Sequence, residues 1–152
     1  MQTRRDALKQ GLAAAGVLGS GAVFTAPAYA FNKNAFEAKS VQDTLKALGG
    51  NGSLVESKDV TITGPDIAEN GAVVPIGAGT ALAGIKLLAL MVEKNPNTLV
   101  AVFNLNENIE PNFLTRAKMG QSSDVYAVAI ANDGKAYYAK KEIKVTLGGC
   151  GG

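Results

Sequence analysis

The chain has 152 residues, with 15 basic and 13 acidic side chains, no histidine and a single cysteine. Without histidine it has no Ser-His-Asp or Cys-His catalytic set, no histidine-ligated haem and none of the usual zinc sites, and one cysteine excludes an intramolecular disulfide or a Cys-x-x-Cys redox pair. Residues 1–30 carry three of the basic and one of the acidic residues, so residues 31–152 hold 12 of each, a balance that points to neither nucleic acid nor an anionic membrane as partner.

The N-terminus has the form of a twin-arginine export signal. Residues 3–9 read Thr-Arg-Arg-Asp-Ala-Leu-Lys, with Ala7 where a phenylalanine is more usual, and a weakly apolar stretch follows from Gly11 to Ala26. This stretch is shorter than the ~20 residues of a membrane-spanning helix. Ala28-Tyr29-Ala30 is a small-x-small cleavage site. We therefore predict that residues 1–30 are removed, and that the mature chain begins at Phe31 in the periplasm, without a membrane anchor.

Residues 31–56 are predicted to form a helix and a linker. Asn34 can cap a helix, with Glu37 at the capping-box position three residues later. Apolar residues then recur with helical spacing at Val41, Leu45 and Leu48. The pattern predicts one helix over 35–48.

Residues 57–147 are predicted to form a β-sandwich. Short apolar or alternating runs follow one another at 58–63, 72–76, 85–93, 99–105, 113–119, 125–131 and 136–147. Pro75 places the second run at a sheet edge or a strand end, and Gly77-Ala78-Gly79 is predicted to be a turn. Asn132-Asp133-Gly134-Lys135 is a strong hairpin signal between the last two runs. About seven short strands with little helix predict a mainly β fold, an immunoglobulin-like two-sheet β-sandwich with a short N-terminal helix.

The last run alternates up to the end of the predicted sandwich. Ile143, Val145 and Leu147 are expected to pack inward, so that the chain is anchored immediately before Gly148. Four lysines on the final hairpin are predicted to form one basic stripe, either a solvated strand face or a docking surface: Lys135, Lys140, Lys141 and Lys144.

The chain ends in Gly148-Gly149-Cys150-Gly151-Gly152, with its only cysteine between two pairs of glycines. Glycine adds nothing to a core and loses the most entropy on ordering, so no fold requires this arrangement. A flexible arm over residues 148–152 instead suits a carrier of a covalently bound group. Cys150 lies three residues beyond Leu147, a reach of about 10 Å when extended.

The sequence supplies a nucleophile without an activator. A free thiol has a pKa near 8.5, and in active sites this pKa is lowered by a histidine, a cation or a helix N-terminus. The tail offers none of these, so we predict a carrier whose thiol is activated inside other enzymes, and no enzyme, metal or cofactor site in this chain. Two alternatives remain open: a structural module that dimerises through Cys150, and a ubiquitin-like sulfur carrier with a thiocarboxylate on Gly152.

Three segments resemble the SoxY family, the sulfur-carrier subunits of the thiosulfate-oxidising Sox system. The first two are Ile67–Pro75 and Ala89–Pro96, and the third is the C-terminus Lys-Lys-Glu-Ile-Lys-Val-Thr-Leu-Gly-Gly-Cys-Gly-Gly. The complete terminal pentapeptide is the most specific of the three.

The resemblance implies a role, partners and a site. Sulfur intermediates would be carried on Cys150 of a SoxY–SoxZ heterodimer and presented to SoxAX, SoxB and, where present, SoxCD. The arm would be Gly148, Gly149, Gly151 and Gly152. We further expect an apolar interface with SoxZ from the long runs Ile85–Val92 and Leu99–Leu105, and export of SoxZ together with this chain.

Overall fold

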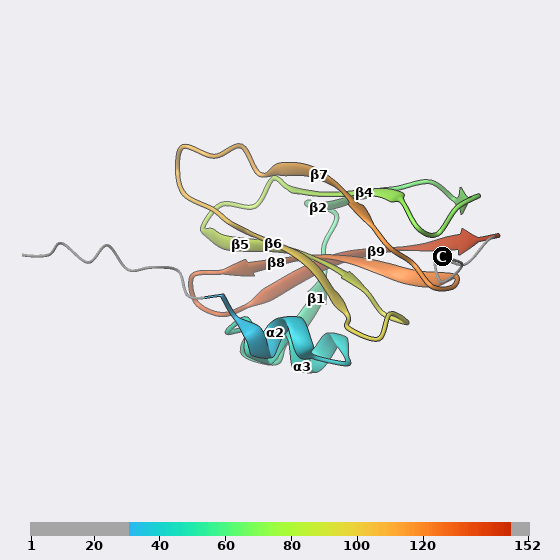
Figure 1. The fold of residues 1–152 in the computed structure, drawn as a ribbon. Helices are drawn as coiled ribbons and strands as arrows, with labels where there is room; N and C mark the ends of the chain where they lie inside the picture. The colour runs from blue at the N-terminus through green and yellow to red at the C-terminus, as the bar shows by residue number, and fades with distance from the viewer. Residues whose placement is uncertain (1–30, 147–152) are drawn as a thin grey trace, which may run out of the picture. The chain divides into compact units, whose positions relative to one another are not determined.

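The computed structural model describes residues 31–146. Within this range two short helices precede nine strands (Figure 1). The helices are α2 (Lys33–Glu37) and α3 (Val41–Ala47). The strands are β1 (Leu54–Glu56), β2 (Val60–Thr63), β3 (Ile67–Ala68), β4 (Val74–Thr80), β5 (Ile85–Val92), β6 (Leu99–Asn104), β7 (Asn112–Ala117), β8 (Ser123–Ala131) and β9 (Ala136–Val145).

The strands form two sheets. The larger has the order β1-β9-β8-β5-β6, with β3 also paired to β9, and the smaller has the order β2-β4-β7. Strands β1 and β3 run parallel to β9, and the remaining pairs are antiparallel. The predicted mainly β, immunoglobulin-like two-sheet β-sandwich is therefore confirmed, with β1 and β3 as strands that the sequence did not predict.

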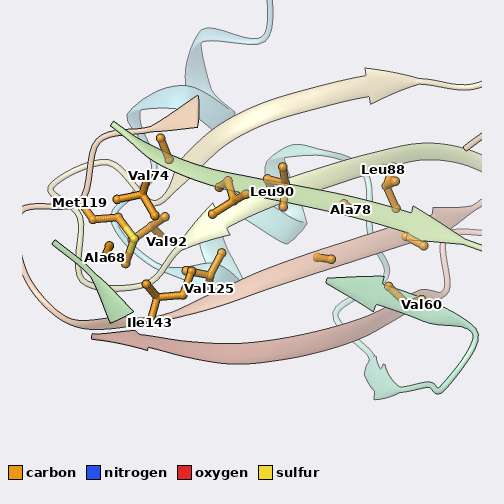
Figure 2. Packing of buried hydrophobic residues seen from close by; sticks show 14 residues of the cluster. Val60, Ala68, Val74, Ala78, Leu88, Leu90, Val92, Met119, Val125 and Ile143 are labelled. Atoms are coloured by element: carbon orange, nitrogen blue, oxygen red, sulfur yellow. The ribbon is translucent and has the colours of Figure 1, made fainter. Parts of the chain in front are cut away.

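Strand β5 is buried on both of its faces. Leu88, Leu90 and Val92 lie in the core between the two sheets (Figure 2). Leu87, Ala89 and Met91 point the other way, into a second core between the larger sheet and the helices. A strand that is covered on both faces has a continuous apolar sequence. The two cores therefore account for the apolar composition of residues 85–92 without any partner protein. The expectation that this run forms a subunit interface is wrong.

The N-terminal helix is divided in two, and the single predicted helix over 35–48 is wrong. Asn32 caps α2, its side chain accepting a bond from the Ala35 amide at 3.1 Å, and Asn34 lies inside that helix. Ser40 caps α3, with its hydroxyl accepting from the Asp43 amide at 3.1 Å. Serine is a strong N-cap because its oxygen satisfies an unpaired amide, so the chain starts a second helix there.

Gly77 and Gly79 lie within β4, so the predicted turn at this glycine pair is wrong. A Cβ on Gly77 would come within 2.5 Å of the Leu114 side chain, and one on Gly79 within 2.8 Å of the Thr61 hydroxyl. The glycines therefore allow the neighbouring strands' side chains to lie across β4. Pro75 is near the start of β4. This part of β4 is paired with β7 but not with β2, so the prediction that Pro75 lies at a strand end is confirmed.

The hairpin between β8 and β9 is confirmed. Gly134 has φ +86°, the left-handed conformation that glycine adopts without strain. The two strands then pair without interruption from Ile130↔Ala136 to Ser123↔Ile143. This long ladder makes β9 an internal strand of the larger sheet and carries the chain toward its C-terminus.

Candidate functional site

The predicted attachment residue Cys150 and the arm glycines Gly148, Gly149, Gly151 and Gly152 lie outside the described residues. The structure describes the strand that leads to them, as far as Thr146. Cys150 follows Thr146 by four positions, a span of at most about 14 Å. The site is therefore built from the residues that hold the end of β9.

On the side that faces β8, the end of β9 is bonded to β8 and to the residue before it. The backbone ladder with β8 runs to the pair Ser123↔Ile143. Beyond it, the Val145 amide donates to the Ser122 hydroxyl at 2.9 Å. A side chain thus replaces the backbone carbonyl as the acceptor for the last amide on this side.

On the other side the end of β9 is bonded to the segment Asp66–Glu69, which contains β3. The Lys144 amide donates to the Asp66 carbonyl at 3.0 Å, and the Thr146 amide donates to the Ala68 carbonyl at 3.1 Å. The Thr146 hydroxyl also donates to the Glu69 carbonyl at 3.1 Å. The backbone is therefore bonded on both sides up to the last described residue.

The side chains that fix this end of the strand are buried. Ile143 is 0% exposed and Ala68 is 6% exposed, and Figure 2 shows both near Val125 and Met119. Val145 is half-buried against the same core. The inward packing predicted for Ile143 and Val145 is confirmed, whereas Leu147 lies outside the described residues.

The final hairpin does not carry one basic stripe, contrary to the prediction. Successive residues of a strand face opposite sides, so Lys140 and Lys141 point apart. Lys140 contacts the Asp124 carboxylate at 3.0 Å, and Lys141 contacts Asp66 at 2.8 Å and the Gly64 carbonyl at 2.6 Å. Lys135 lies in the turn, 3.5 Å from Asp133. Only Lys144 joins Lys140 on one face of β9.

These ion pairs shift the pKa values of their members. The hydrogen bond and charge of Lys141 hold the pKa of Asp66 below its usual range. The Asp124 carboxylate raises the pKa of Lys140, mainly through a hydrogen bond to its ammonium group. The Asp66–Lys141 pair links β9 to the start of β3, so one charged contact reinforces the backbone bonds at the end of β9.

Two further observations concern metal-ligand clusters and membrane-spanning helices among the described residues. Among residues 31–146, no cluster of three or more cysteine or acidic side chains is placed to hold a metal ion. No helix within that range is long and apolar enough to cross a membrane.

The sequence did not single out Ser122 or identify β3 as a strand. A two-residue strand has no periodicity to detect, and Ser122 lies 23 residues before the amide that it binds. The only signal was the family-like segment Ile67–Pro75, which marked the region without giving a physical reason for it.

Comparisons with known proteins identify the family to which this chain is similar. The family described as sulfur oxidation protein SoxY matches residues 45–150, a range that includes Cys150. The sulfur carrier protein SoxY from Chlorobium limicola f thiosulfatophilum is 33% identical, with a TM-score of 0.57 over 62% of this chain and 86% of that chain. A comparison with curated proteins gives no match.

A second solved structure resembles the fold alone. The superoxide reductase (neelaredoxin) from Ignicoccus hospitalis is 21% identical, with a TM-score of 0.50 over 57% of this chain and 79% of that chain. At this identity the likeness concerns the arrangement of strands and carries no inference about chemistry.

Proposed function

The chain belongs to the SoxY family and has a sulfur carrier role in sulfur oxidation, and we propose that it carries its sulfur intermediates covalently on Cys150. The observation that carries this proposal is the position of the lone cysteine just beyond a firmly held strand. The strand is bonded on both sides through Thr146, and the only cysteine of the chain follows four residues later among glycines. Such a thiol can enter a partner's cleft while the sandwich stays outside.

We propose thiosulfate as the first cargo, as the family resemblance implies. The Cys150 thiol and thiosulfate are joined by a new S–S bond to give Cys–S–S–SO₃⁻, with release of one proton and two electrons to the SoxAX cytochrome. Hydrolysis by SoxB then cleaves the S–SO₃ bond, leaving a persulfide on Cys150 and releasing sulfate and two protons. The chain itself supplies the attachment point and no catalytic group.

The test is the replacement Cys150→Ser in the reconstituted thiosulfate-oxidising system. We expect loss of turnover and an unchanged fold, because no other side chain of the chain can form the adduct. Intact mass after turnover separates the alternatives. Adducts on Cys150 support the carrier, a mass gain at the Gly152 carboxyl supports the ubiquitin-like alternative, and a disulfide dimer alone supports the structural module. Retained turnover in Cys150→Ser would contradict the proposal.

We also propose that SoxZ pairs with this chain along β6. Within the described residues β6 is bonded only to β5, so its other edge is open. Val100, Ala101, Val102 and Phe103 are all half-buried, and Phe103 stacks on Phe113 of β7 with ring centroids 4.2 Å apart. An open apolar edge is a favourable place for a second β-sandwich to dock. Charged substitution at Val100 is expected to weaken the heterodimer, as measured by size-exclusion chromatography.

The location proposed for this carrier is the periplasm, reached by the twin-arginine pathway. The proposal rests on the signal-like sequence of residues 1–30 and on the thiosulfate chemistry assigned to Cys150.

A further inference from the structure

We propose that Ser122 and the segment Asp66–Glu69 form a clamp that fixes the root of the thiol arm at Thr146, and that this clamp sets the distance to which Cys150 reaches. The inference rests on the proposed carrier role of Cys150 and adds positioning residues to it. The clamp consists of the Ser122 hydroxyl on one side of β9 and the carbonyls of Asp66, Ala68 and Glu69 on the other.

The first argument is that the clamp begins where the backbone ladder stops. Paired strands hold β9 only as far as Ile143 on the β8 side. Without the Ser122 hydroxyl, the Val145 amide would have no acceptor there, and the strand's last residues would be held from one side only. A strand end held from one side frays more readily, so the Ser122 bond limits the fraying of residues 145 and 146.

The second argument is that the opposite side of the clamp is itself anchored. Ala68 is 6% exposed and packs in the core near Ile143. The Asp66 side chain is 89% exposed and contacts the Lys141 ammonium at 2.8 Å, an exposed ion pair that adds little to this anchoring. Within β3, Ile67 is 58% exposed, so the buried Ala68 is the side chain that fixes this strand. The three carbonyls that bind β9 are thereby held in place.

The consequence is a defined arm length. With the clamp closed, Cys150 is four Cα–Cα steps from the clamped residue Thr146. Release of residues 145 and 146 would make this six, and add about 7 Å of extended reach. The effective concentration of a tethered group falls with about the −3/2 power of tether length, so the thiol's effective concentration at a partner's site would fall about twofold.

The first experiment measures the clamp without any partner enzyme. Ser122→Ala removes the acceptor, and Ser122→Thr keeps a hydroxyl as the conservative variant. We expect hydrogen exchange of the Val145 amide to accelerate about threefold to tenfold in Ser122→Ala, consistent with loss of one hydrogen bond, and to recover in Ser122→Thr. The Ala127 amide, in the middle of β8, should not change.

The second experiment measures reach. A spin label on Cys150, the only cysteine, broadens the amide signals that it approaches. Ser122→Ala and Thr146→Val should each extend this broadening to amides farther from the strand end. Thr98→Val is the matched control for the second change, because the buried Thr98 hydroxyl has no hydrogen-bond partner within the described residues. It should leave the pattern unchanged.

The third experiment connects the clamp to transfer. SoxAX-dependent loading of thiosulfate at low carrier concentration should slow in Ser122→Ala, up to the limit of about twofold for full release, with an unchanged rate of alkylation by iodoacetamide. Unchanged Val145 exchange and an unchanged broadening pattern in Ser122→Ala would overturn the clamp. That result would leave the carrier role intact, whereas retained turnover in Cys150→Ser would contradict the carrier role and leave the exchange and broadening results standing.

Discussion

Replacing Ile143 by alanine tests whether the core holds the strand from which the arm departs. Ile143 is 0% exposed and lies near Ala68 and Met119 (Figure 2). A Cβ placed on Gly64 would be only 2.9 Å from the Ile143 Cδ1 atom, so backbone already packs closely against this side chain. Closely packed backbone limits how far the site can collapse into the cavity that alanine leaves.

The expected loss follows from this packing. Buried isoleucine-to-alanine changes cost 2–5 kcal/mol, and the cost is highest where the cavity stays open. We expect Ile143→Ala to lower the free energy of unfolding by about 3–4 kcal/mol, and Ile143→Val by about 1 kcal/mol. With a slope of about 1.5–2 kcal/mol per molar urea, the alanine variant's midpoint should fall by about 2 M.

The assay is urea unfolding of the mature chain under reducing conditions, which prevent disulfide dimers from forming. Leu114→Ala is the matched control: Leu114 is 74% exposed, and its truncation should change the free energy of unfolding by no more than about 0.5 kcal/mol. Similar losses for Ile143→Ala and Leu114→Ala would refute the reasoning that core packing anchors the end of β9.

Three further predictions concern the arm, the clamp and export. Replacing Gly148 and Gly149 by valine should slow loading by partner enzymes severalfold but not alkylation of the thiol by a small reagent, because β-branched residues stiffen and widen the tail; equal slowing of both would show that the glycines tune the thiol itself. The lowered pKa of Asp66 means that its ion pair stabilises the fold above the usual aspartate range and that this contribution is lost as pH falls through the lowered value. The protection of the amides at the β9 end, measured relative to their intrinsic exchange rate at each pH, should therefore fall slightly in acid, and Asp66→Asn should abolish that dependence. If SoxZ is exported with this chain, Arg4→Lys with Arg5→Lys should retain both subunits in the cytoplasm on cell fractionation, and periplasmic SoxZ in that variant would disprove co-export.

The part of the fold that the sequence predicted is the part with a regular period. Strands β7 and β9 alternate along their length, and the Asp133-Gly134 turn between β8 and β9 has a known backbone requirement. Strands β1 and β3 have three and two residues, too short for any period to be detected. They exist because β9 offers an open edge, which is a property of the tertiary fold.

The candidate site divides in the same way. Cys150 and its glycines are conspicuous as sequence, since nothing about a sandwich requires them. The residues that hold β9 are distant from it along the chain: Thr146 lies 77 positions after Glu69, whose carbonyl accepts the hydrogen bond from the Thr146 hydroxyl. The error over the basic stripe had a different origin. The alternation of a strand already requires Lys140 and Lys141 to face opposite sides, and the prediction grouped them by charge alone.

The composition changes shortly after the described part of β9. Ile143, Val145 and Thr146 are β-branched, which restricts their side chains and favours the extended strand. The glycines begin at Gly148, two residues after the last hydrogen bond of the clamp. Residues that favour a strand thus occupy the positions that the sheet holds, and residues with the greatest backbone freedom occupy those that a carrier needs free. Local preference and tertiary bonding thus both favour the strand as far as Thr146, so lengthening the arm from that side requires changes in both.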